Sequence, residues 1–100
     1  MIEVQLFTQT HEKTILTFNN NVLEYFWGTV NGQSARFHVG QIKSIEITTD
    51  KNGQHTLVMA TKFHTRKEEV SDKALGKTKE MVAEARRAMK STPFVLDHVP

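Results

Sequence analysis

The chain of 100 residues contains no cysteine and no long apolar run. The absence of cysteine excludes disulfide bonds and metal sites built on thiolates. No stretch approaches the roughly 20 apolar residues of a membrane-spanning helix. The first seven residues alternate apolar and polar side chains and lack the basic segment of a secretory signal peptide. We therefore expect a soluble cytoplasmic protein.

The chain nevertheless carries enough apolar material for a packed core. Leu, Ile, Val and Phe together make up 26 of the 100 residues, above the roughly 20% below which chains stay disordered. A chain of this length forms one domain. We place that domain at residues 1–90 and treat residues 91–100 as an apolar C-terminal tail.

The first part of the domain has the pattern of short β-strands. Apolar and polar residues alternate with a period of two, and turn residues such as Asn19-Asn20-Asn21, Asn31-Gly32 and Asp50–Gly53 separate the runs. Gly40 is a candidate bulge or corner that decides between six strands and seven. Within residues 2–63 the expected strands are Ile2–Phe7, Thr14–Phe18, Val22–Trp27, Ala35–Val39, Gln41–Thr49 and His55–Phe63.

The apolar spacing then changes to the three-and-four pattern of an amphipathic helix, which we predict over about residues 66–90. Two starts compete. Thr65 and Glu68 have the spacing of a capping box, and Ser71 or Asp72 is an alternative N-cap. The apolar face comprises Val70, Ala74, Leu75, Met81, Val82, Ala85, Ala88 and Met89.

Strands followed by one helix indicate a mainly β, α+β fold, in which an antiparallel sheet of six to seven strands curls into a partial barrel and the helix caps its open side. The strand order, the segment from Arg36 to Ile47 and the closing helix resemble a pleckstrin-homology-like domain of the small bacterial kind. That resemblance implies a seven-stranded fold. Lipid binding in such domains uses basic residues around the first hairpin. Here Gln9–Lys13 offers one lysine beside a glutamate, so a membrane-lipid partner is not expected.

Nothing in the sequence indicates an enzyme, a cofactor or a metal site. The five histidines include no pair at helical i, i+4 spacing, and no serine stands in a G-x-S-x-G context. The glycines form no phosphate-binding loop. We therefore expect a non-enzymatic protein that requires no cofactor.

Basic residues are concentrated near the end of the domain. Between residues 61 and 90 there are nine Lys or Arg and five Asp or Glu, and Lys79, Arg86 and Lys90 share one flank of the predicted helix. An alternative function is therefore the binding of an anionic surface, lipid or nucleic acid, by this flank. Nucleic-acid binding usually requires a denser basic stripe with exposed aromatic residues, so we do not expect nucleic acid as the partner.

The third predicted strand is apolar on both faces. Leu23, Tyr25 and Trp27 lie on one face, and Val22 and Phe26 lie on the other. In an antiparallel sheet, one face is commonly exposed to solvent and polar. Either the protein's own sheet or tail covers the second face, or the aromatic face binds another protein. The tail poses the same choice through Phe94, Val95 and Leu96. We predict a binding or assembly module that acts through a protein partner or a homo-oligomer.

Overall fold

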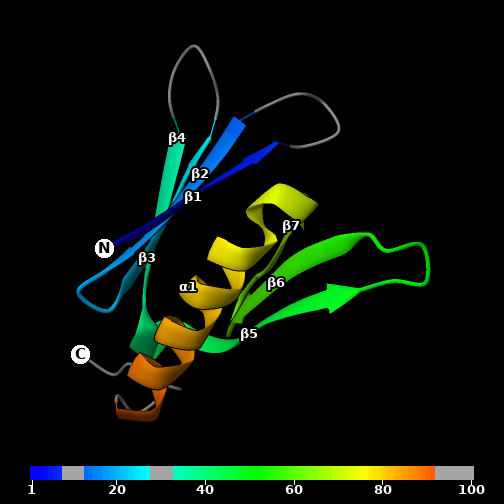
Figure 1. The fold of residues 1–100 in the computed structure, drawn as a ribbon. Coiled ribbons are helices and arrows are strands. Elements are labelled where there is room, and N and C mark those ends of the chain that lie inside the picture. The colour runs from blue at the N-terminus through cyan, green and yellow to red at the C-terminus, as the bar shows by residue number, and fades with distance from the viewer. Residues whose placement is uncertain (8–12, 28–32, 92–100) are drawn as a thin grey trace.

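The computed structural model describes residues 1–7, 13–27 and 33–91. In this part of the chain seven strands precede a single α-helix (Figure 1). In chain order the elements are β1 (Ile2–Phe7), β2 (Lys13–Asn19), β3 (Val22–Trp27), β4 (Gln33–His38), the short 3-10 helix η1 (Val39–Gln41), β5 (Ile42–Thr49), β6 (His55–Thr61), β7 (Thr65–Val70) and α1 (Asp72–Ser91).

The strands form two antiparallel sheets, β1-β2-β3-β4 and β5-β6-β7 (Figure 1). The mainly β architecture with a C-terminal helix is confirmed, but the described strands form two sheets and no closed barrel, where one curled sheet was expected. The division occurs at η1. There the His38 side chain accepts a hydrogen bond from the Gly40 backbone N–H (3.0 Å), and the Gln41 side chain accepts one from the His38 N–H (3.0 Å). These bonds turn the chain from β4 into β5, so Gly40 lies at a corner.

Strand β7 corrects the prediction of strands within residues 2–63 and a helix from about residue 66. Residues 65–70 pair with β6, with Arg66 opposite Met59 and Val70 opposite His55. The strand is polar at nearly every position, so its sequence lacks the alternation of apolar and polar residues that indicates a strand. The helix begins at Asp72, and the Ser71 hydroxyl accepts a hydrogen bond from the Ala74 N–H (3.2 Å). The alternative N-cap is therefore correct, and the capping-box start at Thr65 is wrong.

Two of the predicted turns are confirmed by their backbone geometry. Asn20 and Asn21 have φ values of 51° and 67°, the left-handed conformation that asparagine tolerates in a two-residue hairpin. In the β5–β6 turn the Asp50 carboxylate accepts hydrogen bonds from the backbone N–H groups of Asn52 and Gln54, both at 2.9 Å. Gly53 completes this turn with φ of 82°. The predicted Asn31-Gly32 hairpin lies outside the described residues.

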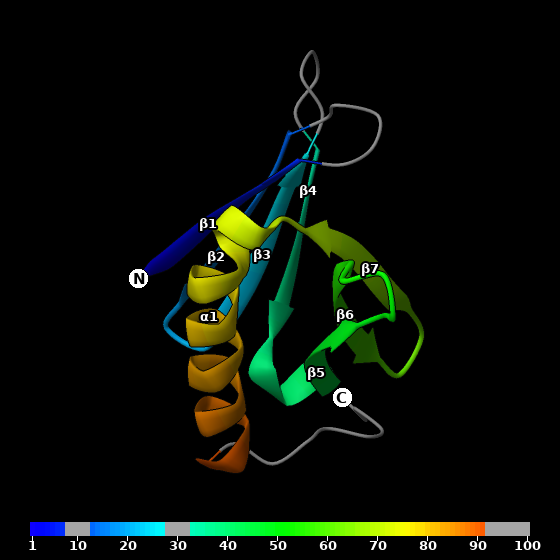
Figure 2. The same cartoon turned by 45° about the vertical axis from the view of Figure 1, so that its right-hand side comes forward.

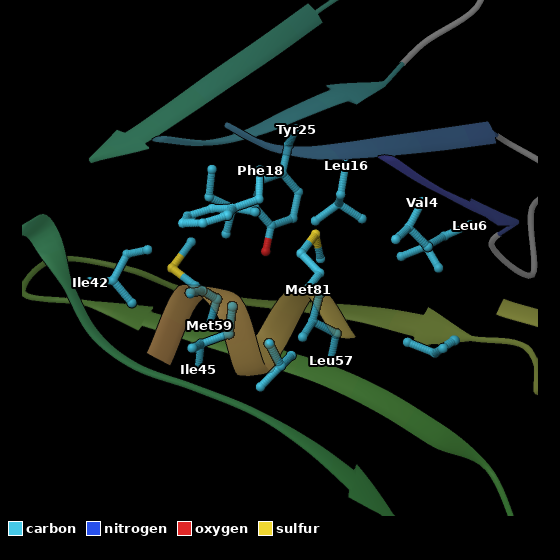
Figure 3. Packing of buried hydrophobic residues seen from close by; sticks show 14 of the residues in the cluster. Val4, Leu6, Leu16, Phe18, Tyr25, Ile42, Ile45, Leu57, Met59 and Met81 are labelled. Atoms are coloured by element: carbon cyan, nitrogen blue, oxygen red, sulfur yellow. The ribbon is translucent and has the colours of Figure 1, made fainter. Parts of the chain in front are cut away.

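The core lies between the inner faces of the two sheets. Figure 3 shows Leu16, Phe18 and Tyr25 pointing from the first sheet toward β5 and β6, which contribute Ile45 and Met59. Helix α1 closes one side of this layer, as Figure 2 shows. Its buried residues are Thr78, Met81, Val82 and Ala85.

Substituting alanine at Gly76 and at Gly53 should have opposite effects on stability. A Cβ atom added at either Gly76 or Gly53 would meet no atom within 4 Å, but Gly53 has φ of 82°. We expect Gly76→Ala to raise the free energy of unfolding by about 1 kcal/mol, and Gly53→Ala to lower it by roughly 1–2 kcal/mol. Urea denaturation of both variants measures this. A loss of stability in Gly76→Ala would mean that α1 is strained at this position.

Candidate functional site

The predicted aromatic interface on β3 turns inward. Leu23 and Tyr25 are each 0% exposed, and Trp27 is partly buried against the core. The second sheet covers this face, which was the alternative that the sequence left open. Leu23 and Tyr25 therefore offer no surface to another protein, and the interface prediction is corrected for these residues. On the opposite face, Phe26 is 39% exposed.

The other half of the predicted interface belongs to the C-terminal tail. Phe94, Val95 and Leu96 lie outside the described residues, so their role as a docking segment stays a prediction.

A half-buried arginine connects the two sheets at Tyr25 and Trp27. The Arg66 guanidinium carbon, from β7, lies 4.7 Å from the ring centroid of Tyr25 and 4.7 Å from that of Trp27. A cation over an aromatic face is attracted by the ring quadrupole, and desolvation strengthens this attraction. An Arg66 Nη also lies 3.6 Å from the Glu68 carboxylate, whose side chain is 13% exposed. The arrangement connects β7 of the second sheet to β3 of the first.

The same cluster buries polar atoms without partners. Among the described residues, Tyr25 Oη and Arg66 Nε have no hydrogen-bond partner, and Figure 3 shows the Tyr25 hydroxyl pointing between the sheets. Burial, reinforced by the negative charge of Glu68, raises the pKa of Tyr25 above its ordinary value. Burial also raises the pKa of Glu68, while the Arg66 charge opposes that shift.

The burial of the Tyr25 hydroxyl and its raised pKa predict how removing this hydroxyl changes stability. A buried polar group without a partner costs about 1–3 kcal/mol, so Tyr25→Phe should raise the free energy of unfolding by about 1 kcal/mol at neutral pH. The unfolded tyrosine ionises near pH 10, whereas the folded protein retains the proton. Wild-type stability therefore falls as pH rises above about 10, and the advantage of Tyr25→Phe should grow by roughly 1.4 kcal/mol per pH unit.

Urea denaturation at several alkaline pH values measures this difference. Tyr25 is the only tyrosine, so the phenolate absorbance of the wild type reports on this residue alone. A stability difference that stays constant across the alkaline range would contradict the assignment of a buried, protonated phenol.

A second polar network joins the end of β5 to the start of α1. The Thr49 hydroxyl lies 2.8 Å from His55 Nδ1, and His55 Nε2 lies 3.0 Å from the Asp72 carboxylate. A carboxylate accepts hydrogen bonds, so His55 Nε2 donates to Asp72. Hydroxyl, imidazole and carboxylate are also the groups of nucleophilic catalysis. The Asp72 side chain is 91% exposed, however, so water weakens its hold on the imidazole.

The basic flank of α1 lies along the edge of the second sheet. Lys79 and Arg86 contribute to a groove of about 310 Å³ between α1 and β5, and Lys90 is exposed farther along the helix. Two residues of the predicted flank, Lys79 and Arg86, therefore line the groove, and the third, Lys90, does not. The lining residues are Glu46, Ile47, Lys79, Val82, Ala83 and Arg86.

The floor of this groove includes an unpaired strand edge. Among the described residues β5 pairs only with β6. The Ile45 carbonyl accepts a hydrogen bond from Arg86 Nε (2.9 Å), so it points away from β6 and toward α1. Because backbone groups alternate in direction along a strand, those of Ile47 and Thr49 also point toward this outer edge. The groove therefore combines backbone donors and acceptors with apolar and basic side chains.

Sequence reasoning located Lys79 and Arg86 but missed the rest of this groove. Glu46 and Ile47 belong to a predicted strand, and Val82 belongs to the predicted apolar face of α1. Their proximity depends on how the helix lies against β5, for which no local pattern gives a signal. The helical spacing of Lys79, Val82, Ala83 and Arg86 was the available hint, because all four share one side of α1.

Other kinds of site find no support in the described part of the chain. Residues 1–7, 13–27 and 33–91 contain no group of three or more histidine and acidic side chains placed to hold a metal ion. Within the same ranges, no helix combines the length and apolar character required to cross a membrane.

Comparisons of the chain with protein-family models, curated proteins and solved structures found no significant match.

Proposed function

We propose that the protein is a binding module that takes up an extended segment of a partner protein in the groove between β5 and α1, where the segment adds a strand to the second sheet. The single observation that supports this proposal is the outer edge of β5, unpaired among the described residues and bordered by a groove. Main-chain hydrogen bonds supply affinity in this mode of recognition, and side-chain contacts supply specificity.

The groove favours an acidic segment. Lys79 and Arg86 contribute positive charge on its helix side, and Glu46 contributes the opposite charge on its strand side. No ion pair joins Glu46 to either basic residue in the described part of the chain, so Glu46 does not neutralise them. Ile47, Val82 and Ala83 provide apolar contacts between these charges. An extended peptide that alternates acidic and apolar residues matches this lining.

The edge of β5 suits this role better than the edge of β1. Both edge strands pack against α1, but β1 also packs against β7, so the corner where the two sheets meet lies at its outer side. A groove of about 380 Å³ also lies there, and it is lined by Glu3, Val4 and Gln5 of β1 together with Ser71, Lys73, Ala74 and Lys77 at the start of the helix. At β5 the groove runs beside outward-facing carbonyl and amide groups instead.

A peptide titration tests the proposal. The probe is an acetylated and amidated hexapeptide of alternating valine and glutamate, added to the isotope-labelled full chain. We expect the largest amide shifts in two-dimensional NMR at Ile45, Ile47 and Thr49, because their N–H groups lie on the outer edge. Lys79→Ala should weaken binding about threefold, as expected for an exposed charge pair.

Two controls separate strand addition from charge attraction. The same hexapeptide methylated on alternate backbone nitrogens keeps its charges but loses the hydrogen bonds of a paired strand. Lys77→Ala removes a basic residue of α1 that lines the other groove, and it should leave the affinity unchanged. Equal β5 shifts with the methylated peptide, or no β5 shifts with the parent peptide, would contradict the proposed function.

A further inference from the structure

The Arg86–Ile45 hydrogen bond occupies a backbone group that an incoming strand needs. Arg86 Nε donates to the Ile45 carbonyl at 2.9 Å, from the helix to the strand edge. The two terminal guanidinium nitrogens of Arg86 form no hydrogen bond or ion pair among the described residues. Arg86 therefore blocks the Ile45 carbonyl on the β5 edge and leaves its two terminal guanidinium nitrogens able to donate hydrogen bonds beside it.

We propose that Arg86 is a displaceable plug on the β5 edge, and that it selects partner segments that carry a carboxylate at the position facing it. This proposal rests on the proposed function, since it concerns access to the same groove. A neutral strand must displace Arg86 from the Ile45 carbonyl without offering the guanidinium a new partner. An acidic strand supplies that partner, because a carboxylate accepts paired hydrogen bonds from arginine.

The plug also accounts for how an exposed edge is kept from pairing with a second copy of the chain. Unpaired strand edges promote edge-to-edge association, and proteins block them with charged side chains or covering elements. Arg86 provides both a charge and a hydrogen bond at the centre of β5. Neighbouring β5 residues are polar and exposed at Ser44, Glu46 and Thr48, but none of these side chains caps the Ile45 carbonyl.

Two peptides and three variants test the plug. The peptides are the valine–glutamate hexapeptide and its valine–glutamine counterpart, which has the same backbone and nearly the same shape. The variants are Arg86→Met, which keeps an apolar stem but has no donor, Lys79→Met, which removes a charge from the same groove, and Lys77→Met, which removes one from the other groove. Affinities are measured by NMR titration on the full chain, after circular dichroism has shown that each variant is folded.

The wild type should bind the glutamate peptide about tenfold more tightly than the glutamine peptide, as expected for a charge-assisted hydrogen bond. In Arg86→Met this preference should fall to about twofold, and the glutamine peptide should bind more tightly than it binds the wild type. Lys79→Met should weaken the glutamate peptide without strengthening the glutamine peptide, and Lys77→Met should change neither affinity.

The outcomes distinguish a failure of the plug proposal from a failure of the proposed function. If Arg86→Met weakens the glutamate peptide and leaves the glutamine peptide unchanged, Arg86 is only a charge, so the plug is wrong and the proposed function stands. If neither peptide shifts the β5 amides in the wild type or in Arg86→Met, both proposals fail. Sedimentation provides a readout without a peptide: the plug requires stronger self-association in Arg86→Met than in Lys77→Met, and equal association would overturn it.

Discussion

The packing of α1 across the gap between the two sheets is the constraint on which the rest of the structure depends. Four strands and three strands face each other over one apolar layer, and Met81, Val82 and Ala85 close one side of it. A domain of this size buries only about two-thirds of its unfolded surface, so it has little apolar area to spare. The helix must therefore lie along the gap, and this position also brings its flank beside the edge of β5.

A second contact between the two sheets is of a different kind. Arg66 bridges Tyr25 and Trp27 across the sheets, and Glu68 compensates its charge. Such a cluster is weak evidence for stability, because removing polar and charged groups from water offsets much of their attraction. It does restrict how the sheets can face each other, since stacking and ion pairing require defined geometry. The two contacts between the sheets thus differ. Helix α1 contributes apolar burial, and Arg66 on β7 restricts the relative orientation of the sheets.

How far the sequence predicts this structure depends on the range of the interactions involved. Alternation and turn chemistry are local, so the Asn20-Asn21 hairpin and the apolar face of α1 were predictable. β7 was missed because Arg66 and Glu68 occupy inward positions where apolar residues are expected. Both faces of β3 are apolar, so no local rule could say which face the second sheet covers. The groove was beyond prediction, because it depends on the angle of a helix against a strand separated from it by two others.

The groove and the core cannot vary independently. Val82 is 6% exposed and belongs to the apolar cluster, yet it also lines the groove. Four residues along the helix, on the same side, Arg86 contacts the Ile45 carbonyl, while the Ile45 side chain is buried beneath α1. A change in core volume that shifts α1 by a fraction of an ångström would alter the Arg86–Ile45 hydrogen bond, because close-packed interiors transmit such shifts. Access to the β5 edge is therefore determined by the same contacts that stabilise the fold.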